Sequence, residues 1–366
     1  MQSLKVDLGS RSYSIRIGKG ISDEIIAIRN SALETGKKVA FFFDAGFRSS
    51  HSFFCEELSN GHSCMDLSSG EKTKSVAHLE QVWNFLAQIK MDRGGVVFAV
   101  GGGVVGDLIG FAAGSFLRGI DFYQVPTTLL AMVDSSVGGK TGINLTAGKN
   151  LVGAFHQPSE VLADTEFLKL LPPREFSAGM AEVIKYGMLA DRSLYQKISG
   201  LAKPLEHGSE ELVNIIKECC SIKASIVKDD EKETSLNGKG RALLNLGHTF
   251  AHAFEAVAGY GTYLHGEAVA VGLVCALKLS KKMGLCPNDS VNQLWDLLRS
   301  YNLPHVLRAS LSLESLLEAM KSDKKVSRGK SRFVIMKEIG DAFQTDDIDQ
   351  NLVSEILEEV GATTTG

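Results

Sequence analysis

Hydrophobic residues in the first half of the chain form short runs that alternate with longer stretches of helical spacing. The runs KKVAFFFD (37–44), VVFAV (96–100) and DFYQV (121–125) are rich in β-branched and aromatic residues, which is typical of buried strands. Two helix-like stretches lie between them, VAHLEQVWNFLAQIK (76–90) and VVGDLIGFAAGSFL (104–117). Strands and helices in this order predict a parallel α/β sheet.

From Pro173 onward the pattern is almost entirely helical. Helical spacing runs through REFSAGMAEVIKYGML, EELVNIIKECCSIKASIVK, ALLNLGHTFAHAFEAVAG and EAVAVGLVCALKLSKKMG. One late run, SRFVIM (331–336), predicts a single strand. We therefore expect a Rossmann-like α/β domain with a parallel sheet over residues 1–172, and a mainly α-helical domain over residues 173–366.

Composition and charge exclude several classes of protein. The chain has 366 residues, of which 44% are hydrophobic and 22% charged, as in ordinary globular proteins. A net charge of −4 without a long basic block gives no indication of nucleic acid or a membrane surface as partner. No apolar stretch reaches the roughly 18–20 residues that span a bilayer, and the N-terminus lacks the apolar core of a signal peptide. The six cysteines make no C-x-x-C pair, so we expect a cytoplasmic protein.

A glycine-rich motif follows the second predicted strand. Gly101, Gly103 and Gly106 satisfy G-x-G-x-x-G at the start of a predicted helix, where free backbone N–H groups can bind a pyrophosphate. Tight turns explain the glycines equally well. The dinucleotide fingerprint is also incomplete, because Asp121 lies before the next strand rather than at its end. Asp44, which ends an earlier strand, is the better candidate to bind the adenosine ribose.

A second glycine-rich segment, VDSSVGGKTG (133–142), is similar to a nucleotide-binding P-loop. Asp134 stands where that motif requires glycine, so a nucleotide hydrolase is not expected. The segment predicts a loop that carries Lys140 and is followed by Lys149 and Asn150, a combination that suits an anion such as phosphate. A surface loop with solvated lysines is an equal alternative.

Polar pairs on predicted helices indicate a metal site. Glu182 and Lys185 stand three residues apart among apolar neighbours, either beside a buried cleft or as a plain surface ion pair. His248 and His252 stand one helical turn apart, and His265 follows. Two histidines with a carboxylate are typical of a catalytic zinc site. Spacing alone therefore predicts His248 and His252 as ligands.

Together these segments resemble the 3-dehydroquinate synthase family. The resemblance is carried, in the family's order, by GGGVVGDLIGFAAGSFLRGI (101–120), VPTTLLAMVDSSVGGKTGIN (125–144), GKNLVGAFHQP (148–158), LLPPREFSAGMAEVIKYG (170–187), RALLNLGHTFAHAFE (241–255), HGEAVAVG (265–272) and DKK (323–325). It implies a carbon–oxygen lyase of the shikimate pathway of aromatic amino acid biosynthesis. The lyase would convert 3-deoxy-D-arabino-heptulosonate 7-phosphate to 3-dehydroquinate and phosphate, with NAD as a recycled cofactor and a zinc or cobalt ion.

The resemblance also implies roles for single residues. NAD would be held by Asp44, Glu71, Lys74, Gly102, Gly103, Asp107, Thr127 and Thr128. The metal would be held by Glu182, His248 and His265, which replaces the pair predicted from spacing. The substrate would be bound by Arg118, Lys140, Lys149, Asn150, Lys223, Arg241 and Lys324. The catalytic lining would consist of Lys185, His252, Asp134 and Asn245. Arg118 would reach in from a neighbouring subunit, which implies a homodimer.

Two features depart from the family's pattern, and three other functions compete. Leu170 stands where the family usually has threonine, and the segment between Lys223 and Arg241 is a few residues longer. One rival is a sugar phosphate cyclase whose substrate lacks a carboxylate, against which Lys223 and Arg241 argue. A second is a metal-dependent polyol dehydrogenase, which would not need the phosphate-binding lysines. A third is a non-catalytic nucleotide-binding protein, which would leave costly unused polar groups.

Overall fold

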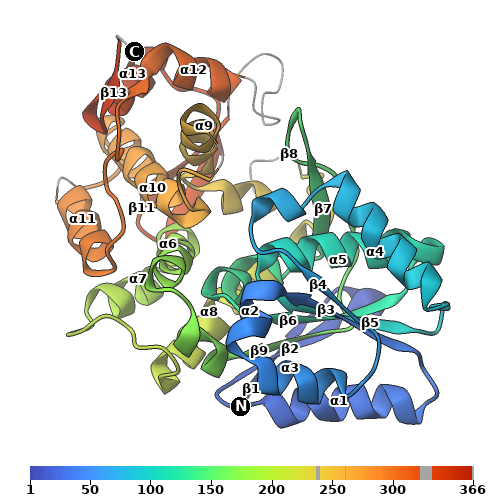
Figure 1. Ribbon diagram of the computed structural model, residues 1–366. Coiled ribbons are helices and arrows are strands. Elements are labelled where there is room, and N and C mark those ends of the chain that lie inside the picture. Colours follow the sequence, from blue (N-terminus) through green and yellow to red (C-terminus); the bar gives the residue numbers. More distant parts are fainter. Residues whose placement is uncertain (236–239, 260, 288, 322–331, 365–366) are drawn as a thin grey trace. The chain divides into compact units, whose positions relative to one another are not determined.

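The computed structural model describes residues 1–235, 240–259, 261–287, 289–321 and 332–364 (Figure 1). The chain folds into two compact units. The first consists of Met1–Pro172 and Leu205–Lys228, and the second of Pro173–Pro204 and Asp229–Gly366. Each unit is described separately below.

Within the described residues, the first unit is built on a seven-stranded sheet of order β1-β2-β9-β6-β5-β3-β4. Its strands are β1 (Gln2–Val6), β2 (Tyr13–Gly18), β3 (Val39–Asp44), β4 (Cys64–Leu67), β5 (Val96–Gly101), β6 (Asp121–Pro126) and β9 (Glu160–Asp164). Strand β1 pairs antiparallel with β2, and the other neighbours are parallel. The predicted parallel sheet is confirmed, and its three predicted strands are β3, β5 and β6.

Helices cover both faces of this sheet because successive side chains of a strand point to opposite faces (Figure 1). Ala40 and Phe42 of β3 pack with α4 and α5, whereas Phe41 and Phe43 pack with α1 and α3. A strand buried on both faces has a continuous apolar sequence, as β3 does. The helices of this unit are α1 (Ser22–Glu34), α2 (Ala45–Ser50), α3 (Ser52–Ser59), α4 (Val76–Gln88), α5 (Gly103–Ser115) and α8 (Glu210–Asp229).

Helix α8 was predicted to lie in the helical domain, but it packs in the first unit. The Cys220 thiol donates to the Met132 carbonyl at 3.2 Å, and Lys223 Nζ donates to the Asp134 carbonyl at 2.6 Å. Helical periodicity predicts that a segment is a helix with an apolar face, but it does not say which core that face joins. The predicted assignment of residues 205–228 to the second domain is therefore corrected.

The predicted glycine-rich loop, residues 133–142, leads into a two-stranded antiparallel ribbon, β7 (Lys140–Leu145) and β8 (Gly148–Phe155), which carries Lys140, Lys149 and Asn150 (Figure 1). Two glycines allow its strands to approach closely. A Cβ on Gly142 would lie 2.5 Å from the Val152 carbonyl oxygen, and a Cβ on Gly153 would lie 2.1 Å from the Thr141 carbonyl oxygen. The predicted loop is thus present at Gly138 and Gly139, which have φ 99° and 66°, but from Lys140 onward the chain is a strand.

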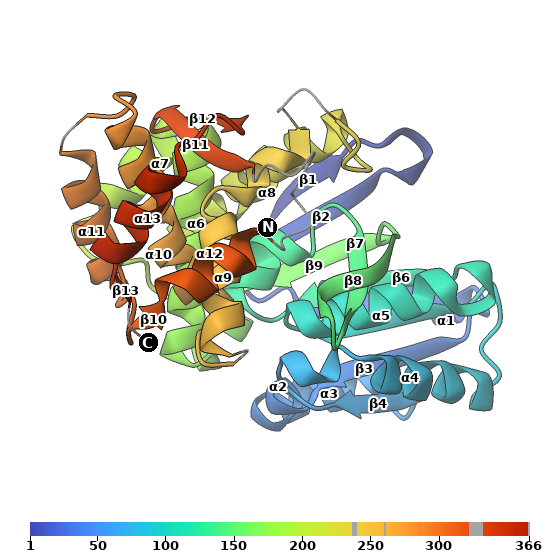
Figure 2. The same ribbon diagram turned by 90° about the horizontal axis from the view of Figure 1, so that it is seen from above.

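The second unit is mainly helical over its described residues, as predicted. Its helices are α6 (Pro173–Ala190), α7 (Arg192–Ser199), α9 (His248–Ala258), α10 (His265–Lys282), α11 (Ser290–Ser300), α12 (Leu313–Lys321) and α13 (Gln350–Glu359). Helix α10 is buried along most of its length and contacts α6, α9, α11 and α13 (Figure 2). The predicted late strand is β11 (Phe333–Glu338), which pairs antiparallel with β12 (Asp341–Thr345), and two short strands, β10 (Leu311–Ser312) and β13 (Ala362–Thr363), also pair.

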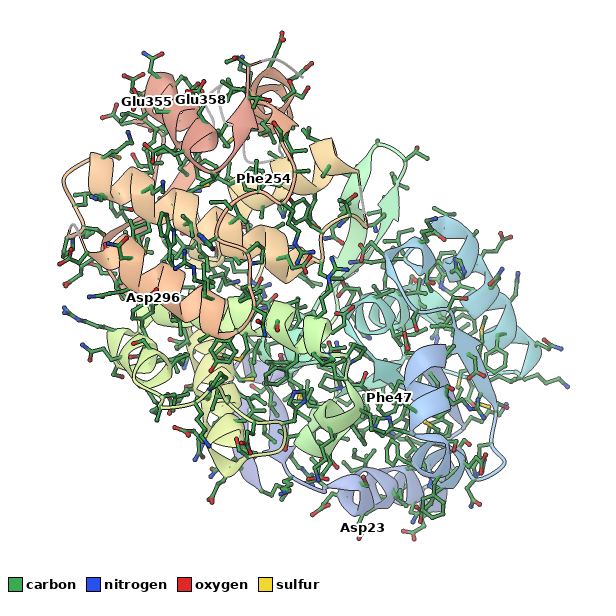
Figure 3. The ribbon with its side chains drawn as sticks, turned by 60° about the vertical axis from the view of Figure 1, so that its left-hand side comes forward. Asp23, Phe47, Phe254, Asp296, Glu355 and Glu358 are labelled. Carbon is green, nitrogen blue, oxygen red and sulfur yellow. The ribbon has the colours of Figure 1, made fainter. Side chains whose placement is uncertain are left out.

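The polarity of side chains follows this packing. Phe254 of α9 is fully buried, whereas Glu355 and Glu358 of α13 are exposed (Figure 3). The buried residues of α13 are Val353, Ile356 and Leu357, which share one helix face. Among the helices of the described chain, none combines the length and apolar character needed to cross a membrane.

Candidate active site

The residues predicted to hold a dinucleotide gather at the carboxyl edge of the first unit's sheet. Asp44 ends β3, Glu71 and Lys74 follow β4, Gly102 and Gly103 follow β5, Thr127 and Thr128 follow β6, and Asp107 lies in the second turn of α5. These four strands are adjacent and parallel, so their carboxyl ends meet along one edge. The chain order changes direction between β3 and β5, and open α/β sheets bind ligands at such a point.

The glycines of the turn from β5 into α5 are closely packed against neighbouring side chains. A Cβ on Gly103 would lie 2.8 Å from Ser135 Oγ, and a Cβ on Gly102 would lie 3.2 Å from Thr128 Cγ2. Gly102 is the N-cap of α5, and no side chain of the described residues caps this helix. Its first N–H groups can therefore donate to an anionic ligand, which fits the pyrophosphate of a dinucleotide.

Polar contacts hold the neighbouring side chains of this edge. Asp44 Oδ1 accepts from Ser69 Oγ at 2.7 Å and from the Phe47 N–H at 3.0 Å. Both of these hydrogen bonds use Oδ1, so Oδ2 can accept from a ribose hydroxyl. Lys74 is 4% exposed and pairs with Asp107. Burial raises the pKa of Asp107, and the positive charge of Lys74 opposes that shift. The edge therefore combines a carboxylate acceptor, a buried ion pair and a helix N-terminus.

Three residues predicted to bind phosphate lie on the β7–β8 ribbon. Lys140 begins β7, and Lys149 and Asn150 lie at the start of β8. The Tyr13 hydroxyl accepts from the Gly138 N–H at 2.9 Å and so positions the turn that precedes Lys140. The ribbon thus presents two cationic side chains and an amide within the same unit as the dinucleotide edge.

Asp134 and Lys223 form an ion pair in the first unit. Lys223 Nζ lies 2.9 Å from Asp134 Oδ1, and its side chain is 9% exposed. The sequence predicted the two residues in different roles, Lys223 for the substrate carboxylate and Asp134 for the catalytic lining. Their contact was not foreseen, because it joins α8 to the segment before β7.

Arg118 lies in an unusual turn after α5. Leu117 has φ 50°, Arg118 has φ 73° and Gly119 has φ 125°. Left-handed backbone is uncommon for residues other than glycine, and two such residues in sequence cost free energy that other contacts must offset. The turn points to a positional requirement for the exposed Arg118 side chain.

A cluster of metal-ligand type lies in the second unit. Glu182 comes from α6, His248 is the first residue of α9, and His265 is the first residue of α10. One ligand atom from each lies within 4.8 Å of the other two. His248 Nε2 and His265 Nε2 are each 3.6 Å from Glu182 Oε1. One carboxylate and two imidazoles suit zinc and related divalent ions, so these residues fit such a metal.

Acceptors behind the two histidines fix how their rings are oriented. His248 Nδ1 lies 3.1 Å from the Leu246 carbonyl, and His265 Nδ1 lies 3.4 Å from Glu255 Oε2. If each Nδ1 donates to its acceptor, each Nε2 presents a lone pair toward Glu182. Sequence reasoning missed Glu255, which is 4% exposed. In the sequence, only the position of Glu255 two helical turns after His248 could have indicated that it lies near the cluster.

The cluster attracts positive charge. Burial lowers the pKa of His265, but hydrogen bonds to Glu182 and Glu255 and their negative charges raise it to about 10. Lys185 Nζ lies 2.5 Å from Glu182 Oε2, and both side chains are 1% exposed. A divalent cation would satisfy the same buried carboxylates.

Glycines bring the helices that carry these ligands together. A Cβ on Gly266 would lie 1.9 Å from the Ala178 carbonyl oxygen, so α10 starts in close contact with α6. A Cβ on Gly272 would lie 2.2 Å from the Gly247 carbonyl oxygen, so α10 also contacts the start of α9. Each glycine neighbours a ligand or lies two turns from one, so close helix packing sets the spacing of the cluster.

A buried carboxylate paired with two half-exposed arginines fixes the start of α10. Glu267 is 2% exposed and accepts from Arg174 Nε and Nη2, each at 2.7 Å, from Arg308 Nη2 at 2.5 Å and from the Leu264 N–H at 2.9 Å. The two guanidinium groups lower the pKa of Glu267, although burial opposes them. Four hydrogen bonds on one carboxylate hold the backbone two residues from His265.

His252 does not belong to this group of donor atoms. Among the described residues, the group contains Glu182, His248 and His265. The His252 ring centre lies 5.7 Å from that of His248 and 6.3 Å from that of His265. The pair predicted from spacing was therefore wrong about His252, because the start of α10 supplies the donor that the next turn of α9 does not.

Two further predicted residues lie in the second unit. Arg241 is 1% exposed, and its Nε donates to the Asp230 carbonyl at 3.0 Å. Asn245 Nδ2 donates to the Ala242 carbonyl at 3.1 Å. Lys324 and residues 236–239 of the longer segment lie outside the described residues. Leu170, which belongs to the first unit, is 60% exposed at the end of a 3₁₀ helix.

Comparison with known proteins gives one consistent family. The profile for the 3-dehydroquinate synthase N-terminal region matches residues 64–178, and that for the C-terminal region matches residues 179–326. A 3-dehydroquinate synthase of Opitutus terrae is 50% identical over 361 residues, which are 99% of each chain. One of Shewanella sp. is 41% identical and covers 97% of this chain and 99% of its own. A crystal structure of 2-deoxy-scyllo-inosose synthase with carbaglucose-6-phosphate, NAD+ and Co2+ is 25% identical, has a TM-score of 0.84, and covers 98% of this chain and 100% of its own.

Proposed function

Because this chain belongs to the 3-dehydroquinate synthase family, we propose that it converts 3-deoxy-D-arabino-heptulosonate 7-phosphate to 3-dehydroquinate and phosphate. It would act as a carbon–oxygen lyase of the shikimate pathway in the cytoplasm, where its six free cysteines would stay reduced. The observation that carries the proposal is the cluster of Glu182, His248 and His265, whose ligand atoms lie within 4.8 Å of one another.

We assign zinc or cobalt to this cluster and NAD to the carboxyl edge of the seven-stranded sheet. Support comes from the one carboxylate and two imidazoles of the cluster and from the closely packed turn at Gly102 and Gly103 before α5. The related structure that contains NAD+ and Co2+ supports both assignments. When bound, NAD supplies a reversible hydride acceptor, and the metal ion supplies Lewis acidity at a substrate hydroxyl. Glu255 and the Leu246 carbonyl would keep the two histidines oriented for binding.

Several polar and cationic side chains are assigned to the charged groups of the substrate. Lys140, Lys149, Asn150 and Arg118 are assigned to the phosphate, where cationic donors hold the group and stabilise the charge of the departing anion. Arg241 is assigned to the substrate carboxylate because its guanidinium is buried and oriented by the Asp230 carbonyl. Lys223, held by Asp134, and Lys324 complete the substrate-binding set of the proposal.

His252 and Lys185 are assigned to proton transfer at substrate hydroxyls, with Asn245 and Asp134 in the polar lining. His252 lies one turn after His248 and outside the ligand group, and histidine is the side chain that most often serves as a general acid or base. Lys185 contacts Glu182, a proposed ligand, so its charge would respond to the bound cation.

We also propose a homodimer in which Arg118 serves the neighbouring subunit. The ribbon exposes four large apolar side chains, which are 39–43% exposed: Leu145, Leu151, Val152 and Phe155. Exposed apolar patches commonly mark contacts with another chain. Gly114 near the end of α5 packs on His156, so the ribbon and the turn that carries Arg118 belong to one surface region.

The test is phosphate release from 3-deoxy-D-arabino-heptulosonate 7-phosphate by purified protein with zinc and a trace of NAD. We expect many turnovers per NAD and no net NADH, because the cofactor is reduced and reoxidised in each cycle. Steady NADH formation with a polyol and no phosphate release would assign the protein to the dehydrogenases instead.

Glucose 6-phosphate, which lacks a carboxylate, is the matched control substrate. We expect no phosphate release from it, because it has no carboxylate for the buried Arg241 to bind. Equal turnover of both substrates would overturn the assignment of Arg241 and leave a cyclase of different specificity.

A further inference from the structure

Asn144 occupies an irregular position in the β7–β8 ribbon. Ile143 pairs with Val152, but Leu145 pairs with Gly148, so the register shifts at Asn144. Three residues of β8, Lys149, Asn150 and Leu151, stand opposite the single residue Asn144, so the extra residues of this bulge lie on β8 and the ladder is interrupted at Asn144. The backbone N–H of Asn144 accordingly donates to the Lys74 carbonyl at 2.9 Å. The ribbon is thereby attached to the segment that follows β4.

The Asn144 side chain uses both halves of its amide. Nδ2 donates to Glu71 Oε1 at 2.7 Å, and Oδ1 accepts from the Asn150 N–H at 2.9 Å. A carboxylate only accepts and a backbone N–H only donates, so the amide has one orientation that satisfies both partners. Aspartate has no donor for Glu71, and alanine has neither group.

The partners of Asn144 belong to two different parts of the proposed site. Glu71 and Lys74 belong to the dinucleotide edge, and Lys74 is in turn paired with Asp107. Asn150 belongs to the phosphate-binding ribbon and has φ 54°, a left-handed conformation that needs local support. The hydrogen bond from its N–H to Asn144 supplies such support.

We propose that Asn144 is a positioning residue that holds the phosphate-binding tip of the ribbon in register with the dinucleotide edge. This rests on the proposed function, because the roles of Glu71, Lys74 and Asn150 come from it. Asn144 touches no reacting group and acts through these three residues. Loss of its side chain therefore weakens both NAD binding and substrate binding, and the chemical step changes less.

The test compares Asn144→Asp, Asn144→Ala and the control Asn84→Asp, which makes the same change at an exposed position of α4. NAD affinity is measured by calorimetric titration without substrate, and KM and kcat are measured separately. We expect Asn144→Asp to weaken NAD binding and raise KM, each about tenfold, because two carboxylates then face each other. Asn84→Asp should change neither. Thermal unfolding checks that the variants are folded. If Asn144→Asp does not fold, the same binding and kinetic measurements on Asn144→Ala test the proposal.

A second substitution tests the hydrogen bond itself. In Glu71→Gln/Asn144→Asp the donor and acceptor are exchanged, since glutamine can donate to the new carboxylate while that carboxylate still accepts from the Asn150 N–H. Because Glu71 is itself assigned to NAD, Glu71→Gln alone is also measured, and we expect Asn144→Asp to weaken NAD binding several-fold less when it is added to Glu71→Gln than when it is added to the unaltered protein.

The outcomes separate this proposal from the proposed function. Unchanged NAD affinity and KM in both Asn144 variants would overturn the positioning role, as would an equal loss of NAD affinity when Asn144→Asp is added to Glu71→Gln and to the unaltered protein. Failure of the unaltered protein to bind NAD would refute the proposed function instead. A fall in kcat with unchanged KM and NAD affinity would also overturn the positioning role, because it would place Asn144 at the chemical step.

Discussion

At the scale of single residues, the candidate metal site depends on groups that are not ligands. Glu255 is nearly fully buried and faces His265 Nδ1, while the Leu246 carbonyl faces His248 Nδ1. Such partners orient a histidine ring and increase its basicity as a ligand. Two predictions separate ligands from neighbours.

Glu255→Ala should weaken zinc binding about 10- to 100-fold, because His265 loses the acceptor that orients its ring. The measurement is competition with a chelating dye, which does not depend on turnover. The matched control is Glu358→Ala on the exposed face of α13 (Figure 3). Equal zinc affinity in both variants would show that Glu255 does not orient the site.

His252→Ala should lower kcat by a factor on the order of 10²–10⁴, the usual contribution of a general acid or base. Its zinc content should stay the same, because His252 lies outside the donor group. Steady-state kinetics measure the change in kcat, and mass spectrometry measures the zinc content. Near-full turnover of the variant would contradict the proton-transfer role of His252. Loss of zinc from the variant would show that His252 is a metal ligand.

At the scale of secondary structure elements, the ends of helices carry the chemistry. His248 and His265 are the first residues of α9 and α10, and Gly102 caps α5. Helix starts are places where the chain can approach another element closely, provided that the residue is small. Gly266 and Gly272 allow this approach, and Glu267 secures it with four hydrogen bonds.

Gly266→Ala should destabilise the protein by about 1–3 kcal/mol and weaken zinc binding, because the new Cβ would overlap backbone of α6. The Ala178 carbonyl would have to move, and α10 would move away from Glu182. Urea unfolding and the zinc competition assay measure the two effects. Gly94→Ala is the control, since its Cβ would meet no atom nearer than 3.4 Å. A variant as stable as the control would contradict the close-packing account.

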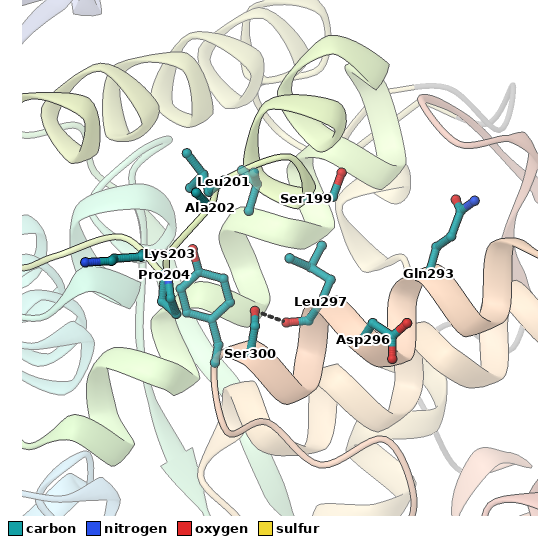
Figure 4. A pocket seen from close by; sticks show the side chains of 11 residues that line it. Ser199, Leu201, Ala202, Lys203, Pro204, Gln293, Asp296, Leu297 and Ser300 are labelled. Carbon is teal, nitrogen blue, oxygen red and sulfur yellow. Dashed lines mark hydrogen bonds between the residues drawn. The ribbon is translucent and has the colours of Figure 1, made fainter.

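A hollow between two other helices has no role in the proposed function. A hollow of about 400 Å³ in the second unit lies between the end of α7 and α11, lined by residues that include Ser199, Lys203, Asp296 and Tyr301 (Figure 4). Its lining mixes apolar and polar groups and shares no residue with the metal cluster. The residues proposed to bind the metal and NAD are instead identified by their donor atoms, their burial and their contacts.

At the scale of the whole molecule, the residues proposed for NAD and those proposed for the metal belong to different compact units. The dinucleotide edge belongs to the first unit, and the metal cluster belongs to the second. Each set of residues is held by contacts within its own unit, such as Lys74 with Asp107 and Glu267 with Arg174.

Removing the metal with a chelator should therefore abolish phosphate release and leave NAD affinity within about twofold, a difference well below 1 kcal/mol. NAD titration of the chelated protein, followed by readdition of zinc, makes the comparison. Recovery of turnover on readdition is the control for irreversible unfolding. A large loss of NAD affinity in the chelated protein would show that the two parts are coupled.

The sequence alone determined the kinds of element, the parallel sheet and the family. Periodicity of side chains reflects the local geometry of strands and helices, so β3, β5, β6 and the helical second half could be predicted. The order of short motifs along the chain determined the family resemblance, which named Glu182, His248 and His265 together.

Only the tertiary structure decided which residues meet. It placed α8 in the first unit, formed the β7–β8 ribbon after the glycine-rich turn, and brought ligand atoms of Glu182, His248 and His265 within 4.8 Å of one another. It also revealed Glu255 and Asn144, which no motif had marked. The physical reason is that these contacts join residues on different elements. Periodicity records which face of an element is apolar, but it does not record which partner covers that face.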